Sequence, residues 1–80
     1  MSEVKLEVDK IRDLLVTYVI SKAMAEGMTI EIRENPYTTY VNVILEQEFN
    51  PDEYNLDNKQ FIENILSKTT GKTVAILVYN

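Results

Sequence analysis

The side chains that could carry out chemistry in this chain are carboxylates, lysine, arginine, tyrosine and hydroxyl groups, because the 80 residues include neither cysteine nor histidine. These two absences exclude thiolate catalysis, Ser/His/Asp and Cys/His arrangements and the usual zinc sites. Glu46 and Glu48 would point the same way from one strand and could serve as paired carboxylates. A general acid usually needs a buried carboxyl group, and nothing in the sequence indicates a closed cleft. We therefore expect no enzyme, and we keep a weak carboxylate enzyme as an alternative.

The segment Thr70-Gly71-Lys72-Thr73 resembles part of a phosphate-binding loop. Such a loop needs a glycine five positions before the Gly-Lys pair and a helix directly after it. Leu66 occupies the earlier position, and an apolar run typical of a strand follows Thr73. We predict that Gly71 ends a helix and that Lys72 begins a strand. Of the phosphate-binding interpretation, only a single contact of Lys72 with an anion then remains.

The oxygen-bearing residues Asn50, Asp52 and Asp57 suggest a calcium loop at first sight. Calcium loops of the helix–loop–helix type place oxygen ligands at alternate positions around a central glycine, and Tyr54 and Leu56 interrupt that spacing. A polar turn followed by a helix cap explains these residues, and we expect neither a metal nor a cofactor.

The charge of the chain indicates the kind of partner it can bind. Thirteen acidic and 8 basic residues give a formal charge of -5. This balance opposes binding to nucleic acid or to an anionic membrane, whereas the basic surface of a protein is a suitable partner. Neither a secretion leader nor an apolar run near the ~20 residues of a membrane span is visible, so we expect a cytoplasmic protein.

The elements that must position these side chains follow from hydrophobic periodicity. Residues 2–26 lack proline and glycine and predict an amphipathic helix with Ser2 as its cap and Gly27 as its stop. Alternation in residues 28–33 and 40–49 predicts a hairpin around an Asn35–Thr38 turn. In that register Ile32 faces Val41, Ile30 faces Val43 and Met28 faces Leu45.

A second helix and a last strand complete the predicted fold. The helix is capped by Asp57 or Asn58, and its apolar stripe consists of Phe61, Ile62, Ile65 and Leu66. Residues 72–79 form the strand. We predict one α+β domain over residues 1–80, in two layers and in the order α-β-β-α-β, with the long first helix and the second helix packed on a three-stranded sheet.

Two segments are more apolar than a small monomer needs. The far side of the first helix carries Val16, Ile20, Ala23 and Met24, and the last strand is apolar on both faces. Either that strand is central and covered twice, or one face meets a partner. These features favour a homo-oligomer, in which the last strand or the second hairpin strand could pair across a two-fold axis. The alternative is a monomer whose second helix and long loop wrap over the first helix.

Arg33, Tyr37 and Tyr40 gather near the predicted hairpin turn and form a candidate recognition patch, with a possible cation–π contact between Arg33 and Tyr40. Together with the acidic charge, this patch suggests a non-enzymatic inhibitor or adaptor that occupies a basic surface of a partner, as compact proteins of phages and mobile elements often do. The alternative is a protein that sequesters a nucleotide or another small anionic ligand at a subunit interface. The candidate binding residues are Arg33, Tyr37, Tyr40, Glu46, Glu48 and Lys72.

Overall fold

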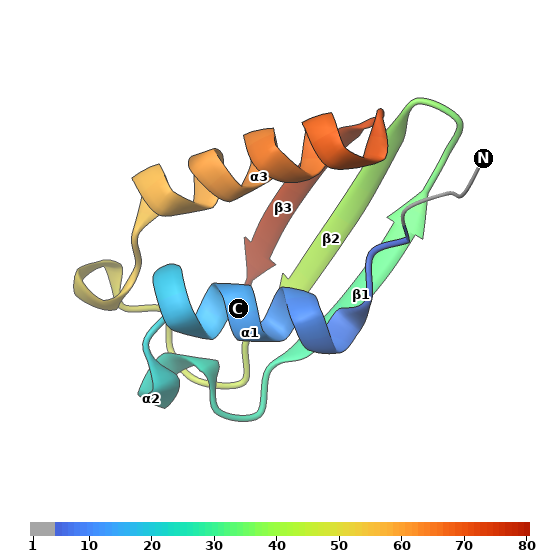
Figure 1. Cartoon of the computed structure of the whole chain (residues 1–80). Coiled ribbons are helices and arrows are strands. Elements are labelled where there is room, and N and C mark those ends of the chain that lie inside the picture. Colours follow the sequence, from blue (N-terminus) through green and yellow to red (C-terminus); the bar gives the residue numbers. More distant parts are fainter. Residues whose placement is uncertain (1–4) are drawn as a thin grey trace.

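Helices and one sheet form two layers in the computed structural model, which describes residues 5–80 (Figure 1). In chain order the described elements are α1 (Val8–Tyr18), α2 (Lys22–Ala25), β1 (Thr29–Glu34), β2 (Thr38–Ile44), a 3-10 turn (Pro51–Glu53), α3 (Leu56–Thr70) and β3 (Thr73–Tyr79). The predicted α+β class and the order of its main elements are confirmed, with α2 as an additional short helix.

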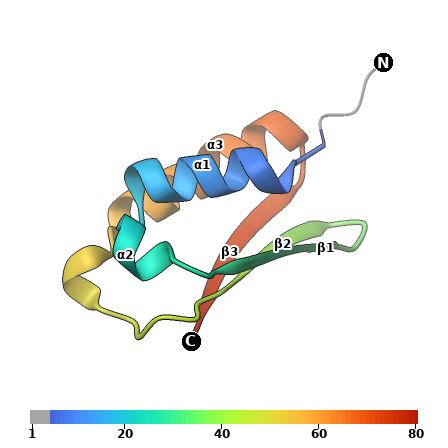
Figure 2. The ribbon, with the colours of Figure 1, turned by 90° about the horizontal axis from the view of Figure 1, so that it is seen from below.

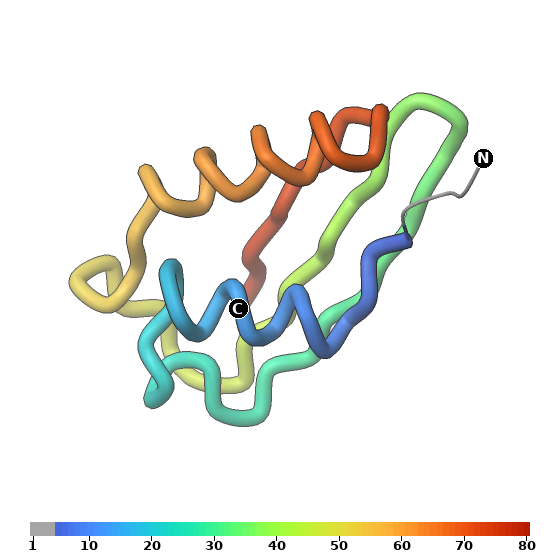
Figure 3. The backbone as a smooth tube through the Cα atoms, in the orientation of Figure 1, coloured from blue at the N-terminus to red at the C-terminus, as the bar shows by residue number. Residues whose placement is uncertain are grey.

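The first helix is shorter than the sequence predicts. It begins at Val8 with Glu7 at the N-cap position, and the predicted cap Ser2 lies outside the described residues. It ends at Tyr18, so the prediction of one continuous helix up to residue 26 is wrong. In Figure 3 the backbone tube leaves the coil of α1 and turns before it enters α2.

The break between α1 and α2 has a local and a distant cause. Val19 and Ile20 are β-branched and Ser21 competes for backbone hydrogen bonds, so this segment is a weak helix former. Ile20 forms an antiparallel bridge with Tyr54, and the Ser21 hydroxyl caps α2 by accepting from the Met24 N–H (3.1 Å). The turn buries Ile20 and Met24 to 2% and 1% exposure in the core. Ile20 and Met24 thus pack in the core of the single chain. For these two residues, the expectation that they form a second buried surface on one long helix is wrong.

The hairpin has the predicted register. Ile30 pairs with Val43 and Ile32 pairs with Val41, and the Asn35 N–H donates to the Thr38 carbonyl (2.9 Å) across the turn. β2 stops at Ile44, so the prediction that alternation continues as a strand to residue 49 is wrong. After Ile44 the chain bends into the loop that leads to α3.

The strand order β1-β2-β3 makes β2 central and leaves β3 at an edge, parallel to β2. Of the two alternatives for the last strand, a central strand covered on both faces is therefore ruled out, and so is pairing of β2 across a two-fold axis. The helix α3 connects β2 to β3 and ends as predicted, because Gly71 adopts φ +77, a left-handed conformation that glycine tolerates. Its cap is Asn55, which accepts from the Asn58 N–H (2.9 Å), and not Asp57 or Asn58.

The core lies between the sheet and the helices, which cover the same face of the sheet (Figure 2). Ile62 is buried there and Leu66 is half-buried, but the predicted stripe of α3 is too wide, because Phe61 and Ile65 are 64% and 46% exposed. The buried apolar residues are Ile11, Leu15, Val19, Ile20, Met24, Met28, Ile30, Val41, Val43, Leu45, Ile62, Val74 and Ile76. None of the helices in residues 5–80 has the length and apolar character needed to cross a membrane.

Candidate functional site

No helix within residues 5–80 lies over one face of the sheet (Figure 2). Side chains alternate across a strand, so the residues beside the core positions of β2 and β3 point to this uncovered side. The parallel register sets Tyr40 beside Ala75 and Ile44 beside Tyr79, and Leu77 lies between them along β3. We call the surface formed by Tyr40, Ile44, Ala75, Leu77 and Tyr79 the open face.

The open face is apolar and accessible. Tyr40 and Ile44 are each 37% exposed, Leu77 is 38% exposed and Tyr79 is 49% exposed. The β1 residues of the same side, Thr29, Glu31 and Arg33, are polar, so the apolar surface lies over β2 and β3. The half-buried Asn42 beside Leu77 is a polar residue within it. The predicted apolar character of both faces of residues 72–79 is confirmed: the helices cover one face and leave the other exposed.

The negative charge of the chain is concentrated at one end of the molecule. Residues 19–29 and 45–57, which we call the acidic end, contain six carboxylates and one lysine, giving -5, and the rest of the chain contains seven acidic and seven basic residues. Among residues 5–80, five ion pairs are formed and none includes a carboxylate of the acidic end. The carboxylates are those of Glu26, Glu46, Glu48, Asp52, Glu53 and Asp57.

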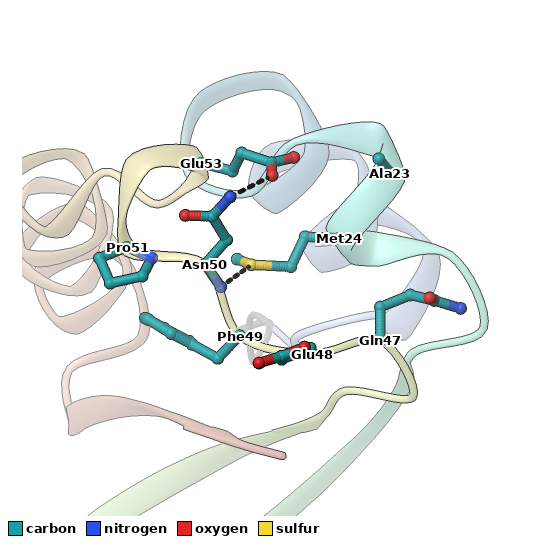
Figure 4. A pocket seen from close by; sticks show the side chains of 8 residues that line it. All are labelled: Ala23, Met24, Gln47, Glu48, Phe49, Asn50, Pro51 and Glu53. Carbon is teal, nitrogen blue, oxygen red and sulfur yellow. Dashed lines mark hydrogen bonds between the residues drawn. The ribbon is translucent and has the colours of Figure 1, made fainter.

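Hydrogen bonds hold the loop of the acidic end against α2. The Glu53 carboxylate accepts from the Ser21 hydroxyl (2.5 Å). It also accepts from the Asn50 side-chain amide (2.6 Å), and the Asn50 N–H lies 3.1 Å from the Met24 sulfur (Figure 4). Met24, Asn50 and Glu53 border a cavity of about 480 Å³, which Glu48 also lines. Glu53 is thus used to build the loop, whereas Glu46 and Glu48 are exposed.

The C-terminal residue connects the acidic end to the open face. The Asn80 side chain accepts from the Phe49 N–H (3.0 Å) and donates to the Gln47 carbonyl (2.9 Å). Asn80 directly follows Tyr79 of the open face, and the Leu45 N–H donates to the Tyr79 carbonyl (2.7 Å). The open face and the loop that carries Glu46 and Glu48 therefore adjoin at this end of the sheet.

The fold perturbs the ionisation of Tyr54, which lies in the acidic end. Its ring packs against Phe49, with ring centroids 5.1 Å apart. Burial raises the pKa of the Tyr54 phenol above its usual value of 10.0, and the nearby negative charge of Glu63 raises this pKa further. The fold therefore favours the neutral phenol.

The predicted binding residues near the hairpin turn come together, but they are engaged in other contacts. Arg33 pairs with Tyr40 in the register and forms an ion pair with Glu31 (3.9 Å). Within residues 5–80 the aromatic contact found is that of Phe49 and Tyr54, so the expected cation–π contact of Arg33 is absent. Lys72 binds Glu34 (3.1 Å) beside the turn. A ligand pocket at this end stays a prediction.

Glu46 and Glu48 lie at the opposite end of β2 from the hairpin turn, in a bent loop and not on a strand. Seven residues of β2 separate the two groups, which corresponds to about 20 Å. The six predicted binding residues therefore lie in two groups at opposite ends of β2, and Tyr40 of the hairpin group also belongs to the open face. Asn50 and Asp52 form a turn, since the Asn50 side chain accepts from the Asp52 N–H (3.0 Å). In the described part of the chain no group of three or more potential metal ligands is present.

Comparison with protein-family models, with curated proteins and with solved structures gives no match to this chain. Its function is therefore argued from the geometry alone. Sequence reasoning identified the apolar surplus of the last strand, which includes Leu77 and Tyr79, but missed Glu26, which the tertiary structure adds to the acidic end. No local pattern distinguishes Glu26 from any other exposed carboxylate at the end of a helix.

Proposed function

We propose that the chain is a non-enzymatic binding protein, an inhibitor or adaptor that acts as a homo-oligomer and occupies a basic surface of a partner macromolecule. The observation that carries the proposal is the junction of the open face with the acidic end. Leu77 and Tyr79 provide exposed apolar area, and Glu46 and Glu48 provide negative charge beside it.

This combination is suited to protein recognition. Binding energy at interfaces is concentrated in a few well-packed side chains, often aromatic, and charged residues at the rim mainly accelerate encounter and select partners. Tyr40 and Tyr79 are the aromatic residues of the open face. A partner with an apolar depression bordered by lysine or arginine would complement both surfaces. In this proposal Arg33, Tyr37 and Lys72 at the hairpin end lie outside the contact.

The test is capture of host proteins on immobilised wild-type chain and on two variants of equal net charge. Glu46→Lys with Glu48→Lys reverses charge at the acidic end, and Asp9→Lys with Asp13→Lys does so on the exposed side of α1. We expect one identified basic protein to bind wild type and the α1 variant, and to bind the acidic-end variant roughly tenfold more weakly at low salt.

A second variant separates the apolar from the electrostatic contribution. Leu77→Lys places a charge in the centre of the open face, and it should weaken binding at both low and high salt because it removes apolar contact. Equal capture by wild type, the acidic-end variant and Leu77→Lys, or capture insensitive to salt, would contradict the proposal.

A further inference from the structure

The outer edge of β3 is closed by side chains of α3. The Val74 N–H donates to the Ser67 hydroxyl (2.8 Å), and the Ile76 N–H donates to the Glu63 carboxylate (2.7 Å). Lys59 donates to the Ile76 carbonyl (3.2 Å). These backbone groups face away from β2, and they are the groups that an added strand would use. Pairing of the last strand across a two-fold axis, which the sequence suggested, would have to displace them.

The edge of β1 is the remaining edge of the sheet, and it lies on the side away from α3 (Figure 1). Backbone groups in an antiparallel pair point alternately toward the partner strand and away from it. Because the Asn35 N–H donates to the Thr38 carbonyl across the turn, the backbone groups of Asn35 and of every second residue before it point toward β2. By this alternation the N–H and C=O groups of Ile30, Ile32 and Glu34 point outward. Arg12 reaches the Met28 carbonyl (3.5 Å), which marks the end of the free segment.

We propose that β1 pairs with β1 of a second copy of this chain, antiparallel about a two-fold axis at Ile32, to form one continuous sheet. This inference rests on the homo-oligomer of the proposed function and assigns its interface. The hydrogen-bonded pairs would be Ile32 with its own copy and Ile30 with Glu34 on either side. All of them use outward-pointing groups, as strand pairing requires.

Charge complementarity selects this register. Centred on Ile32, the pairing sets Glu31 opposite Arg33 of the second copy, twice by symmetry, and opposite charges directly across an antiparallel pair are stabilising. Moving the axis to Glu31 or Arg33 sets like charges against each other, and moving it to Ile30 sets Glu31 against Thr29. Glu31 and Arg33 are exposed, and their contact within one chain is long (3.9 Å), so both can re-pair between copies.

The flank of α1 above this edge adds apolar surface. Val8 and Val16 lie one helical turn on either side of Arg12, and the Arg12 contact with Met28 shows that this flank overhangs β1. Both valines are partly buried against the core. The two-fold axis would bring this flank of each copy toward the other on the same face of the sheet. Val16, an apolar residue on the far side of α1, would then contribute apolar surface to the dimer interface.

The experiment is a charge-exchange cycle followed by light scattering and sedimentation equilibrium on the full chain. Glu31→Arg or Arg33→Glu alone converts both cross-strand pairs to like charges, and we expect either to weaken the dimer about tenfold. The double variant, Glu31→Arg with Arg33→Glu, restores opposite charges in the exchanged sense and should restore the dimer to near wild-type strength. Circular dichroism verifies that each variant is folded.

Three outcomes separate this inference from the proposed function. A dimer that weakens in both single variants and recovers in the double variant supports the pairing. A dimer that is unaffected by the substitutions at Glu31 and Arg33 but dissociates in Leu77→Lys overturns the β1 interface and supports a homo-oligomer formed through the open face. A monomer at every concentration overturns both the interface and the oligomeric part of the proposed function, while partner capture tests binding separately.

Discussion

At the scale of the residue, Tyr54 links the loop of the acidic end to the core. It pairs with Ile20 in the bridge that ends α1, and its ring contacts Phe49. A phenol in this position is held neutral by burial and by the charge of Glu63. Its ionisation therefore reports whether the loop is docked.

The raised pKa of Tyr54 predicts a loss of stability in alkaline solution. Above pH 10.0 the unfolded chain releases the Tyr54 proton before the folded chain does, so the free energy of unfolding falls as pH rises from 10.0 to the higher folded pKa. Below this window the contribution is fully present. Urea unfolding at a series of pH values should show this fall in wild type and a smaller fall in Tyr54→Phe.

Tyr37→Phe is the matched control, because Tyr37 is 81% exposed at the hairpin turn. It removes a phenol without changing the packing of the loop, so its pH dependence should follow that of wild type. If Tyr54→Phe and Tyr37→Phe behave alike, burial of the Tyr54 phenol does not contribute to alkaline unfolding.

At the scale of the element, α3 has two functions in the fold. Ile62 and Leu66 pack on the sheet, while Lys59, Glu63 and Ser67 bind the backbone of β3 from the side. An exposed edge of seven residues without charge or proline would be a template for aggregation. The polar flank of α3 protects that edge, and within residues 5–80 β1, with its charged residues, is the edge left without a partner strand.

Removal of the two acceptors should expose the β3 edge. Glu63→Ala with Ser67→Ala leaves the N–H groups of Val74 and Ile76 without their partners, and we expect a loss of roughly 2–4 kcal/mol in the free energy of unfolding. We also expect concentration-dependent aggregation. Urea unfolding and turbidity measure the two effects.

The control for this prediction is Gln60→Ala with Asn64→Ala, which changes two exposed positions of the same helix. Alanine favours helix at such positions, so this variant should be as stable as wild type or slightly more stable. A double variant at Glu63 and Ser67 with the unfolding midpoint of this control would show that α3 does not protect the edge.

At the scale of the whole molecule, charge is distributed unevenly. The acidic end carries the net charge of the chain, and hydrogen bonds join its two segments. Concentrated charge of one sign keeps a protein soluble and steers association, but it destabilises the compact state by self-repulsion. The binding surface proposed above is thus maintained at a cost in stability.

Salt should reveal this repulsion. Raising the ionic strength from about 0.01 M to about 0.15 M shortens the screening length from about 30 Å to about 8 Å. We expect the thermal midpoint of wild type to rise, and to rise less in Glu46→Gln with Glu48→Gln because part of the repulsion is already removed. Calorimetry at the two ionic strengths measures the difference.

The comparison variant is Asp9→Asn with Asp13→Asn, which has the same net charge as Glu46→Gln with Glu48→Gln but removes the charge from α1. Its midpoint should respond to salt at least as strongly as that of wild type. An equal reduction of the salt effect in both variants would show that charge at the acidic end contributes no more to the repulsion than charge on α1.

The sequence by itself determined the features that depend on neighbouring residues. Period-two alternation set the hairpin register of Ile30 and Ile32, and a glycine after the last apolar residue ended α3 at Gly71. The two apolar faces of β3 were also evident. These features follow from strand alternation and from the left-handed conformation of glycine, which operate over a few residues.

The tertiary structure alone decided the end of α1, the position of β3 in the sheet and the separation of the predicted binding residues into two groups. The end of α1 depends on Tyr54, which lies 34 positions after Ile20, and the closed edge of β3 depends on Glu63 and Ser67. Such contacts form only when the chain is folded, because each needs a backbone group left unpaired by one element and a partner, either backbone or side chain, supplied by another.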